Sequence, residues 1–69
     1  MNKEFCERLS KLRKESGLTQ KQLAQQLNTT ERRISHMETG NIEPDLDTLI
    51  AISNLFEVST DYLLGKTEY

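Results

Sequence analysis

Helix-ending and helix-capping residues divide this chain into short segments, and this division limits what the chain can fold into. Gly17, Gly40 and Gly65 each follow a run in which apolar residues recur every three or four positions. Glycine ends helices because it readily adopts the left-handed conformation that the exit requires. Residues whose side-chain oxygens can accept from the free backbone N–H groups of a helix N-terminus precede four of the runs. These capping residues are Thr19, Thr30, Asp45 and Ser59.

The spacing predicts five short helices, at about 3–16, from 20 onward, at 31–39, from 46 onward and at 60–64. Asn28, between the second and third helices, tolerates the left-handed conformation that a tight turn needs. No segment shows sustained two-residue alternation, so strands are not expected. We expect one all-α domain over residues 1–69, with five short helices around one core at about 5–65. The expected core residues are Phe5, Leu9, Leu12, Ser16, Leu23, Ala24, Leu27, Ile34, Met37, Leu46, Leu49, Ile52, Ser53 and Phe56.

Composition argues against an enzyme or a metalloprotein. A chain of 69 residues has little room for a buried active site. Cys6 and His36 are the only strong ligands for a soft metal, and no glycine-rich phosphate loop is present. We expect no catalytic residues, no metal and no cofactor. With no signal peptide and no apolar run of about 20 residues, the sequence predicts a cytoplasmic protein without a membrane partner.

The charge is distributed unevenly along the chain. The formal net charge is −2, yet residues 1–40 hold eight Lys or Arg against five Asp or Glu. Residues 41–69 hold one Lys against six acidic residues. An acidic chain can still present a basic face to phosphates. The alternative is an ordinary solvated surface with a chance asymmetry.

The second and third expected helices have the spacing of a helix-turn-helix. About three residues, 28–30, separate them, which is the connection that lets two helices cross steeply. Ile34 and Met37 share one face of the third helix. The opposite face holds hydrogen-bonding side chains, as a helix in the major groove of DNA requires. These side chains belong to Glu31, Arg32, Ser35, His36 and Thr39. On periodicity alone, an ordinary amphipathic surface helix remains an alternative.

An ordered series of motifs then resembles a known family, the Cro/repressor (Xre-like) helix-turn-helix regulators. The motifs are LTQKQLA at 18–24, Ile34-Ser35, Glu38-Thr39-Gly40, Pro44 and VSTDYLLG at 58–65, so the match covers residues 5–65. The resemblance implies a lambda-repressor-like fold with the second and third helices as the helix-turn-helix. It also implies binding to double-stranded DNA by a transcriptional regulator, with repression as the expected sign.

The resemblance assigns roles to individual residues. Base edges would be read by Glu31, Arg32, Ser35 and His36. Phosphates would be contacted by Gln20, Lys21, Thr30, Arg33, Thr39 and Asn41. Arg13 and Glu38 would form an ion pair that joins the first helix to the third, and a phosphate contact is the alternative role for Arg13. Glu43 departs from phage relatives, which often have basic residues before Pro44, so phosphate contact by that loop's side chains is in doubt.

Self-association is expected near the end of the chain. On the fourth helix, Leu55 is expected to point away from the core. In phage relatives the subunits meet around the last helix, so the expected interface is Leu55, Val58, Tyr62 and Leu64. The sequence thus predicts a weak homodimer on a near-palindromic operator. The alternative is a monomer in solution, in which an exposed Leu55 is merely tolerated. A rival interpretation is a protein-interaction module of the same fold, such as an antitoxin-like or anti-repressor adaptor, whose acidic second half engages a basic partner.

Overall fold

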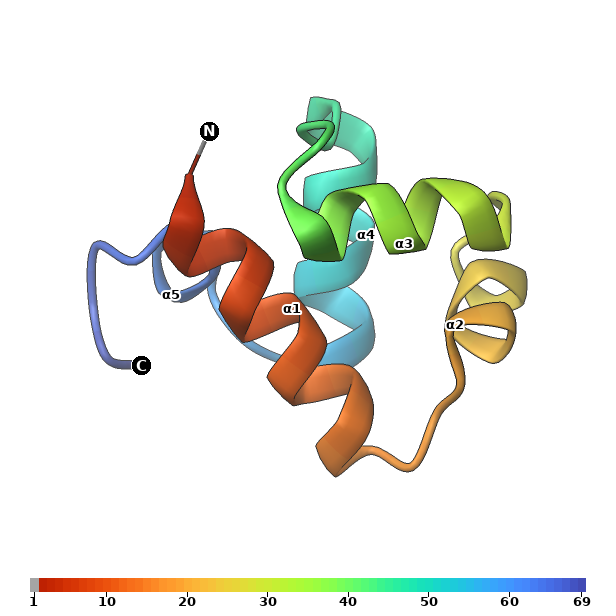
Figure 1. The fold of residues 1–69 in the computed structure, drawn as a ribbon. Coiled ribbons are helices and arrows are strands. Elements are labelled where there is room, and N and C mark those ends of the chain that lie inside the picture. Colours follow the sequence, from red (N-terminus) through yellow and green to blue (C-terminus); the bar gives the residue numbers. More distant parts are fainter. Residues whose placement is uncertain (1) are drawn as a thin grey trace.

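The computed structural model describes residues 2–69, which fold into five helices joined by short turns (Figure 1). The helices are α1 (Lys3–Glu15), α2 (Gln20–Gln26), α3 (Glu31–Thr39), α4 (Leu46–Phe56) and α5 (Thr60–Leu63). The predicted all-α fold with five short helices is therefore confirmed, and the bounds differ from those expected by about one residue. None of the helices in this part of the chain is long and apolar enough to cross a membrane.

The residues predicted to cap helices do so. The Thr19 hydroxyl accepts from the backbone N–H of Gln22, and the Gln22 side chain accepts from the backbone N–H of Thr19 in return. Thr30, Asp45 and Ser59 each accept from the backbone N–H three residues later. The left-handed residues include Asn28, with φ of 60°, as the sequence predicts. These local interactions fix where each helix begins and how the chain turns between helices.

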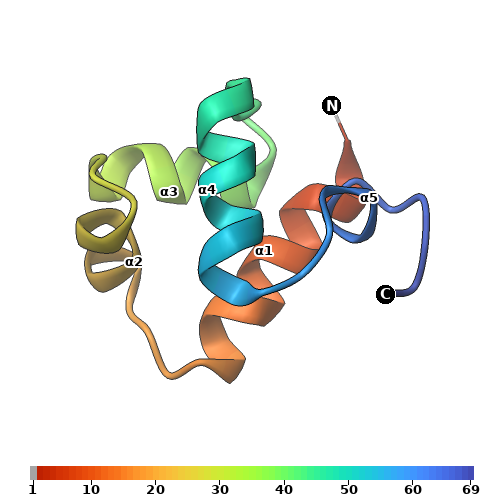
Figure 2. The same ribbon diagram turned by 180° about the vertical axis from the view of Figure 1, so that it is seen from behind.

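The cap of α1 was not predicted, and it also connects the two ends of the fold. The Asn2 carboxamide oxygen accepts from the backbone N–H of Phe5 at 2.8 Å. The amide nitrogen of Asn2 donates to the carbonyl of Leu64 at 2.9 Å. The beginning of α1 is thereby held against the end of α5, and Figure 2 shows these segments on the same side of the molecule.

A single core lies where α1, α2, α3, α4 and α5 meet. Seven of its side chains are almost fully excluded from solvent: Phe5, Leu9, Leu23, Ile34, Met37, Ile52 and Leu63. Each helix contributes at least one of them. Ile34 and Met37 are 0% exposed, so the face of α3 that bears them is the inner one. Helix α3 packs against α1 and α2, and its ribbon crosses that of α4 in both views (Figures 1 and 2). The face of α3 turned away from the core is consequently left to solvent.

Two expected core residues lie outside the core. Ser16 is exposed just after α1 ends, and Leu46 is 77% exposed at the start of α4. At about 100° per residue, Leu46 lies about 120° from the buried Ile52, whereas Leu55 lies about 60° from it. Leu55 is half-buried and packs on the core, so the expectation that it points away is wrong. The core-facing stripe of α4 is centred on Ile52.

The C-terminal tail folds back onto α1 through one arginine. The Arg8 guanidinium lies over the Tyr62 ring, 4.3 Å from its centroid, and donates to the carbonyls of Tyr62 and Thr67. It also pairs with the Glu68 carboxylate at 3.5 Å. One side chain of α1 therefore holds both α5 and the tail that follows it.

Candidate nucleic-acid interface

The connection between α2 and α3 is a tight turn that sets the angle of α3. Leu27 closes α2, Asn28 takes the left-handed conformation, and the Thr29 N–H donates to the carbonyl of Ala24 at 2.9 Å. Thr30 then caps α3 through the backbone N–H of Arg33. Hydrogen bonds at both ends of this turn, one to a backbone carbonyl and one to the Thr30 hydroxyl, therefore restrain the orientation of α3 relative to α2.

Helix α3 separates polar from apolar residues as the sequence predicts. Ile34 and Met37 are both 0% exposed, and they anchor the helix to the core. The opposite face is open to solvent along its length. On it, Glu31, Arg32 and Thr39 are exposed, and Ser35 and His36 are half-exposed. This face presents donors and acceptors of both charge signs.

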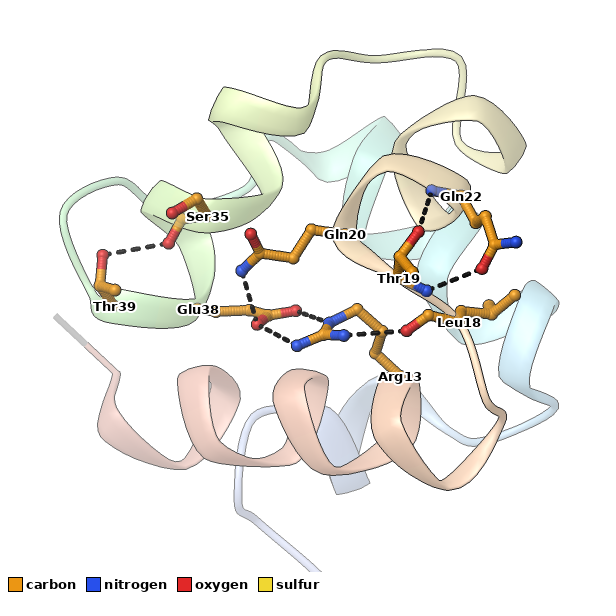
Figure 3. Close-up of polar contacts among 8 residues, drawn as sticks. All are labelled: Arg13, Leu18, Thr19, Gln20, Gln22, Ser35, Glu38 and Thr39. Carbon is orange, nitrogen blue, oxygen red and sulfur yellow. Dashed lines mark hydrogen bonds and ion pairs between the residues drawn. The ribbon is translucent and has the colours of Figure 1, made fainter.

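A network of three side chains fastens the C-terminal half of α3 to α1 and α2 (Figure 3). Arg13 donates to both carboxylate oxygens of Glu38, from Nε at 2.6 Å and from Nη2 at 3.1 Å. The same guanidinium donates from Nη1 to the carbonyl of Leu18 at 2.8 Å. Gln20 donates from its side-chain nitrogen to Glu38 at 3.2 Å. The ion pair expected from the sequence is therefore present, and it extends to α2 through a contact that was not expected.

The residues expected to contact phosphates lie in different surroundings. Lys21 is exposed, while the side-chain nitrogen of Gln20 is engaged by Glu38. The hydroxyl of Thr30 accepts from the backbone N–H of Arg33, and that of Thr39 donates to the carbonyls of Ser35 and His36. Hydroxyls retain further acceptor capacity in such arrangements. The hydrogen bonds of Gln20, Thr30 and Thr39 restrict the directions in which these side chains can bind a phosphate.

Arg33 is exposed, and its charge lowers the pKa of Asp45, the residue that caps α4. Hydrogen bonds from Thr48 hold the pKa of the Asp45 carboxyl below its ordinary value, and the positive charge of Arg33 lowers this pKa further. Arg33 therefore lies close enough to Asp45 for its positive charge to act on the carboxylate that caps α4.

His36 and Asn41 form a pair that the sequence did not indicate. The Asn41 side-chain nitrogen lies 3.2 Å from His36 Nδ1, and the Asn41 backbone N–H donates to the His36 carbonyl at 2.8 Å. If the amide donates, Nδ1 accepts and the ring proton lies on Nε2. A polar residue just beyond the helix-ending Gly40 was the only local signal for this pairing.

The expected interface residues are largely engaged within the domain. Leu55 and Val58 pack on the core, and Tyr62 lies beneath Arg8. Leu64 is half-buried and lines a pocket beside the N-terminus of α1. The large hydrophobic side chains that are truly exposed among residues 2–69 are instead Leu46, Ile50 and Tyr69.

Residues 2–69 hold no group of three or more His, Cys, Asp or Glu side chains arranged to bind a metal ion. Cys6 is buried in α1, and its thiol lies 3.4 Å from the carbonyl of Asn2.

Comparison with known proteins identifies the fold and the family. The family model described as helix-turn-helix matches residues 9–63, which include the turn, both of its helices and most of the core. The chain belongs to this helix-turn-helix family. The predicted resemblance to Xre-like regulators and the lambda-repressor-like fold are confirmed. Because the family consists of transcriptional regulators and not of enzymes, the prediction that the chain is not an enzyme is also confirmed.

Several curated bacterial regulators are similar to the chain. It is 49% identical over 61 residues to the HTH-type transcriptional regulator ImmR of Bacillus subtilis, a match covering 88% of this chain and 48% of that protein. YqaE of the same organism, an uncharacterized HTH-type transcriptional regulator, is 48% identical over 87% of this chain and 52% of YqaE. The HTH-type transcriptional activator BcrR of Enterococcus faecalis is 43% identical over 94% of this chain and 32% of BcrR. The chain thus spans about half the length, or less, of these relatives.

Proposed function

We propose that the chain binds double-stranded DNA at specific sequences, with α3 in the major groove, and that it thereby regulates transcription. One observation carries this proposal: the polar face of α3 is exposed, while its opposite side is fixed by the buried Ile34 and Met37 and by the Arg13–Glu38 pair. A rigid helix with a free polar face is what major-groove recognition needs. The relatives are bacterial regulators, so the proposal places the chain in a bacterial cytoplasm.

The proposal assigns base recognition to four side chains. Arg32 is exposed near the N-terminus of α3 and can donate to two acceptors of a guanine at once. Glu31 accepts from a cytosine amino group, or it rejects other bases by repulsion. Ser35 and His36 lie further along the same face. A ring proton on His36 Nε2 would present a donor to the groove, and Asn41 holds the opposite side of the ring.

Phosphate contacts are assigned to the residues that flank this face. Lys21 and Arg33 supply positive charge, and Thr30, Thr39 and Asn41 supply polar groups at the two ends of α3. Gln20 contributes through its backbone and through the side-chain oxygen, since its nitrogen is held by Glu38. Such contacts position a protein on DNA and make its affinity depend on salt.

The test is selection of duplexes from a random pool, followed by titration of the selected duplex at several salt concentrations. We expect one sequence to be enriched, and the logarithm of its affinity to fall with the logarithm of salt at about −0.9 per neutralised phosphate. No enrichment together with a flat salt response would exclude DNA binding as the main role.

Dimerisation is a further part of the proposal. Two copies on a near-palindromic operator would place their α3 helices about 34 Å apart, one turn of DNA. Only the parts of Leu55, Val58, Tyr62 and Leu64 that remain accessible contribute, so the dimer is weak and DNA strengthens it. Sedimentation equilibrium with a selected palindrome and with one half-site distinguishes a dimer from two copies that bind independently. Two copies bound cooperatively to the palindrome agree with the proposal, and independent binding of each copy contradicts it.

The proposed sign of regulation is repression by occupying a promoter. BcrR carries the name of an activator, so the sign is not a property shared by all relatives. A reporter gene with the selected site placed over the promoter, or upstream of it, tests this point. Lower expression from the overlapping site agrees with repression, and higher expression from the upstream site with no effect at the overlapping one contradicts it.

A further inference from the structure

Two aliphatic side chains stand exposed on one turn of α4. Leu46 is 77% exposed and Ile50 is 52% exposed. Residues four apart on a helix are neighbours, so together they form one apolar ridge. Single exposed aliphatics need no explanation, but an adjacent pair in so small a domain is apolar surface that folding leaves uncovered.

A pocket lies beside this ridge. It has a volume of about 170 Å³ and is lined by Asn2, Phe5, Glu43, Pro44, Leu49 and Leu64. Pro44 immediately precedes the cap of α4, and Leu49 is one turn after Leu46, which places the pocket next to the ridge along the helix. A dry cavity of about 150 Å³ can hold a benzene molecule, so this volume suits one apolar side chain of a partner. The pocket can hold one apolar side chain of a partner, and the ridge can contact the residues beside it.

Carboxylates surround this apolar area. Glu43 lines the pocket, and Asp45 and Asp47 are exposed on either side of Leu46. From 41 to 65 the sequence has no Lys or Arg. In the described part of the chain, the ion pairs join Arg8 to Glu68 and Arg13 to Glu38, so neither involves this area. Arg33 offsets the charge of Asp45 from the α3 side only.

These charges select among possible occupants. DNA phosphates would be repelled by Glu43 and Asp47. A second copy docked through the same area would set its own carboxylates against these, and like charges facing each other are unfavourable. A partner with basic residues around an apolar anchor satisfies both the charge and the uncovered ridge.

We propose that this α4 surface, formed by Leu46, Ile50, Glu43 and Asp47 with the adjoining pocket, binds a cationic amphipathic helix of a partner protein. An apolar residue of that helix enters the pocket and others cover the ridge, while its Lys or Arg residues meet the carboxylates. The area is small, so the complex is transient. The surface shares no residue with the base-reading face of α3, so the proposal does not depend on DNA binding.

The experiment is a titration of the ¹⁵N-labelled chain with a synthetic helical peptide of about 15 residues, long enough to form a helix. The peptide carries Leu at i, i+4 and i+7 and Lys on the flanks. A second peptide replaces each Lys with Glu, and a third replaces each Leu with Ala. We expect only the first to shift the amide signals of Glu43, of residues 45–50 and of Asn2. The Leu46→Ser/Ile50→Ser variant should weaken its binding by about tenfold or more, because central apolar contacts dominate such interfaces.

Matched variants make the result decisive. Asp47→Lys should also weaken the first peptide, whereas Tyr69→Ser, which removes the exposed aromatic at the other end of the chain, should not. Since Leu46 and Ile50 are exposed, the double variant should unfold at the same urea concentration as the parent. Equal binding by the parent and the double variant would overturn the proposal. So would shifts confined to α3, equal binding of the Glu peptide, or a concentration-dependent dimer that the double variant abolishes.

Discussion

Arg13 on α1 and Glu38 on α3 are joined by two hydrogen bonds between guanidinium and carboxylate, and both side chains are largely withdrawn from solvent. The exposed fraction is 12% for the Arg13 side chain and 6% for that of Glu38. The carbonyl of Leu18 and the amide of Gln20 complete the hydrogen bonding around the pair. The geometry of α3 relative to the rest of the domain therefore depends on a charge pair that water does not replace.

Breaking this pair is expected to be costly. Arg13→Met leaves the Glu38 carboxylate buried without its counter-charge, and Glu38→Gln does the converse to Arg13. Each should lower the free energy of unfolding by about 3 kcal/mol, as for other buried pairs that lose one member. Urea denaturation followed by circular dichroism measures this. The double variant Arg13→Met/Glu38→Gln should lose less unfolding free energy than the sum of the two single variants, because it leaves no buried charge unpaired. Single variants as stable as the parent would show that the pair is unimportant to stability.

The features that the sequence predicted well are those set by neighbouring residues. Thr19 and Thr30 cap helices because a hydroxyl three residues before a free N–H can reach it in any context. The spacing of Thr19 and Gln22 is also that of the reciprocal capping box. The inner face of α3 followed from Ile34 and Met37, since no other apolar residue competes on that helix.

The features that were missed depend on which helices meet in space. Helix α4 is apolar on several sides, so periodicity allows more than one core-facing stripe. Packing against the other helices selects the stripe centred on Ile52, and this selection buries part of Leu55 and exposes Leu46. The contact from Gln20 to Glu38 joins side chains of different helices, for which the sequence carries no local signal. For the contact from Asn41 to His36, the only local signal is a polar residue just beyond Gly40.

Arg32 should distinguish base recognition from general attraction to DNA. If it donates to a guanine, Arg32→Ala should cost about 1–3 kcal/mol on the selected duplex and relax the preference at one position. Lys21→Ala is the matched control, because loss of a phosphate contact weakens all sequences alike. Fluorescence anisotropy with selected and scrambled duplexes provides both affinities. An equal loss on both duplexes for Arg32→Ala would mean that Arg32 contacts the backbone and not a base.

Arg8 should matter for the order of the C-terminal tail. Arg8→Ala removes the stacking on Tyr62 and the donors to the carbonyls of Tyr62 and Thr67. We expect a loss of about 1–2 kcal/mol in unfolding free energy, given typical values for one cation–π contact and one or two hydrogen bonds. Amide exchange in residues 66–69 should become faster. Arg8→Lys keeps the charge but cannot reach several acceptors at once, so it should recover only part of the loss. Unchanged exchange in Arg8→Ala would contradict this role.

Glu57 offers a substitution that should stabilise the domain. It ends α4 with φ of 55°, a left-handed conformation that costs a residue with a Cβ about 1–2 kcal/mol. Glu57→Gly removes that strain at an exposed position, while the greater freedom of glycine in the unfolded chain offsets part of the gain. We expect a net increase of about 0.5 kcal/mol or more in unfolding free energy, measured by urea denaturation.

Glu57→Ala, which keeps the Cβ, should gain little. Asn28→Gly is a second control, because asparagine already tolerates its φ of 60° and should gain less than Glu57→Gly. If Glu57→Ala stabilises the domain as much as Glu57→Gly, the effect comes from removing a carboxylate at the C-terminal end of α4 and not from the backbone.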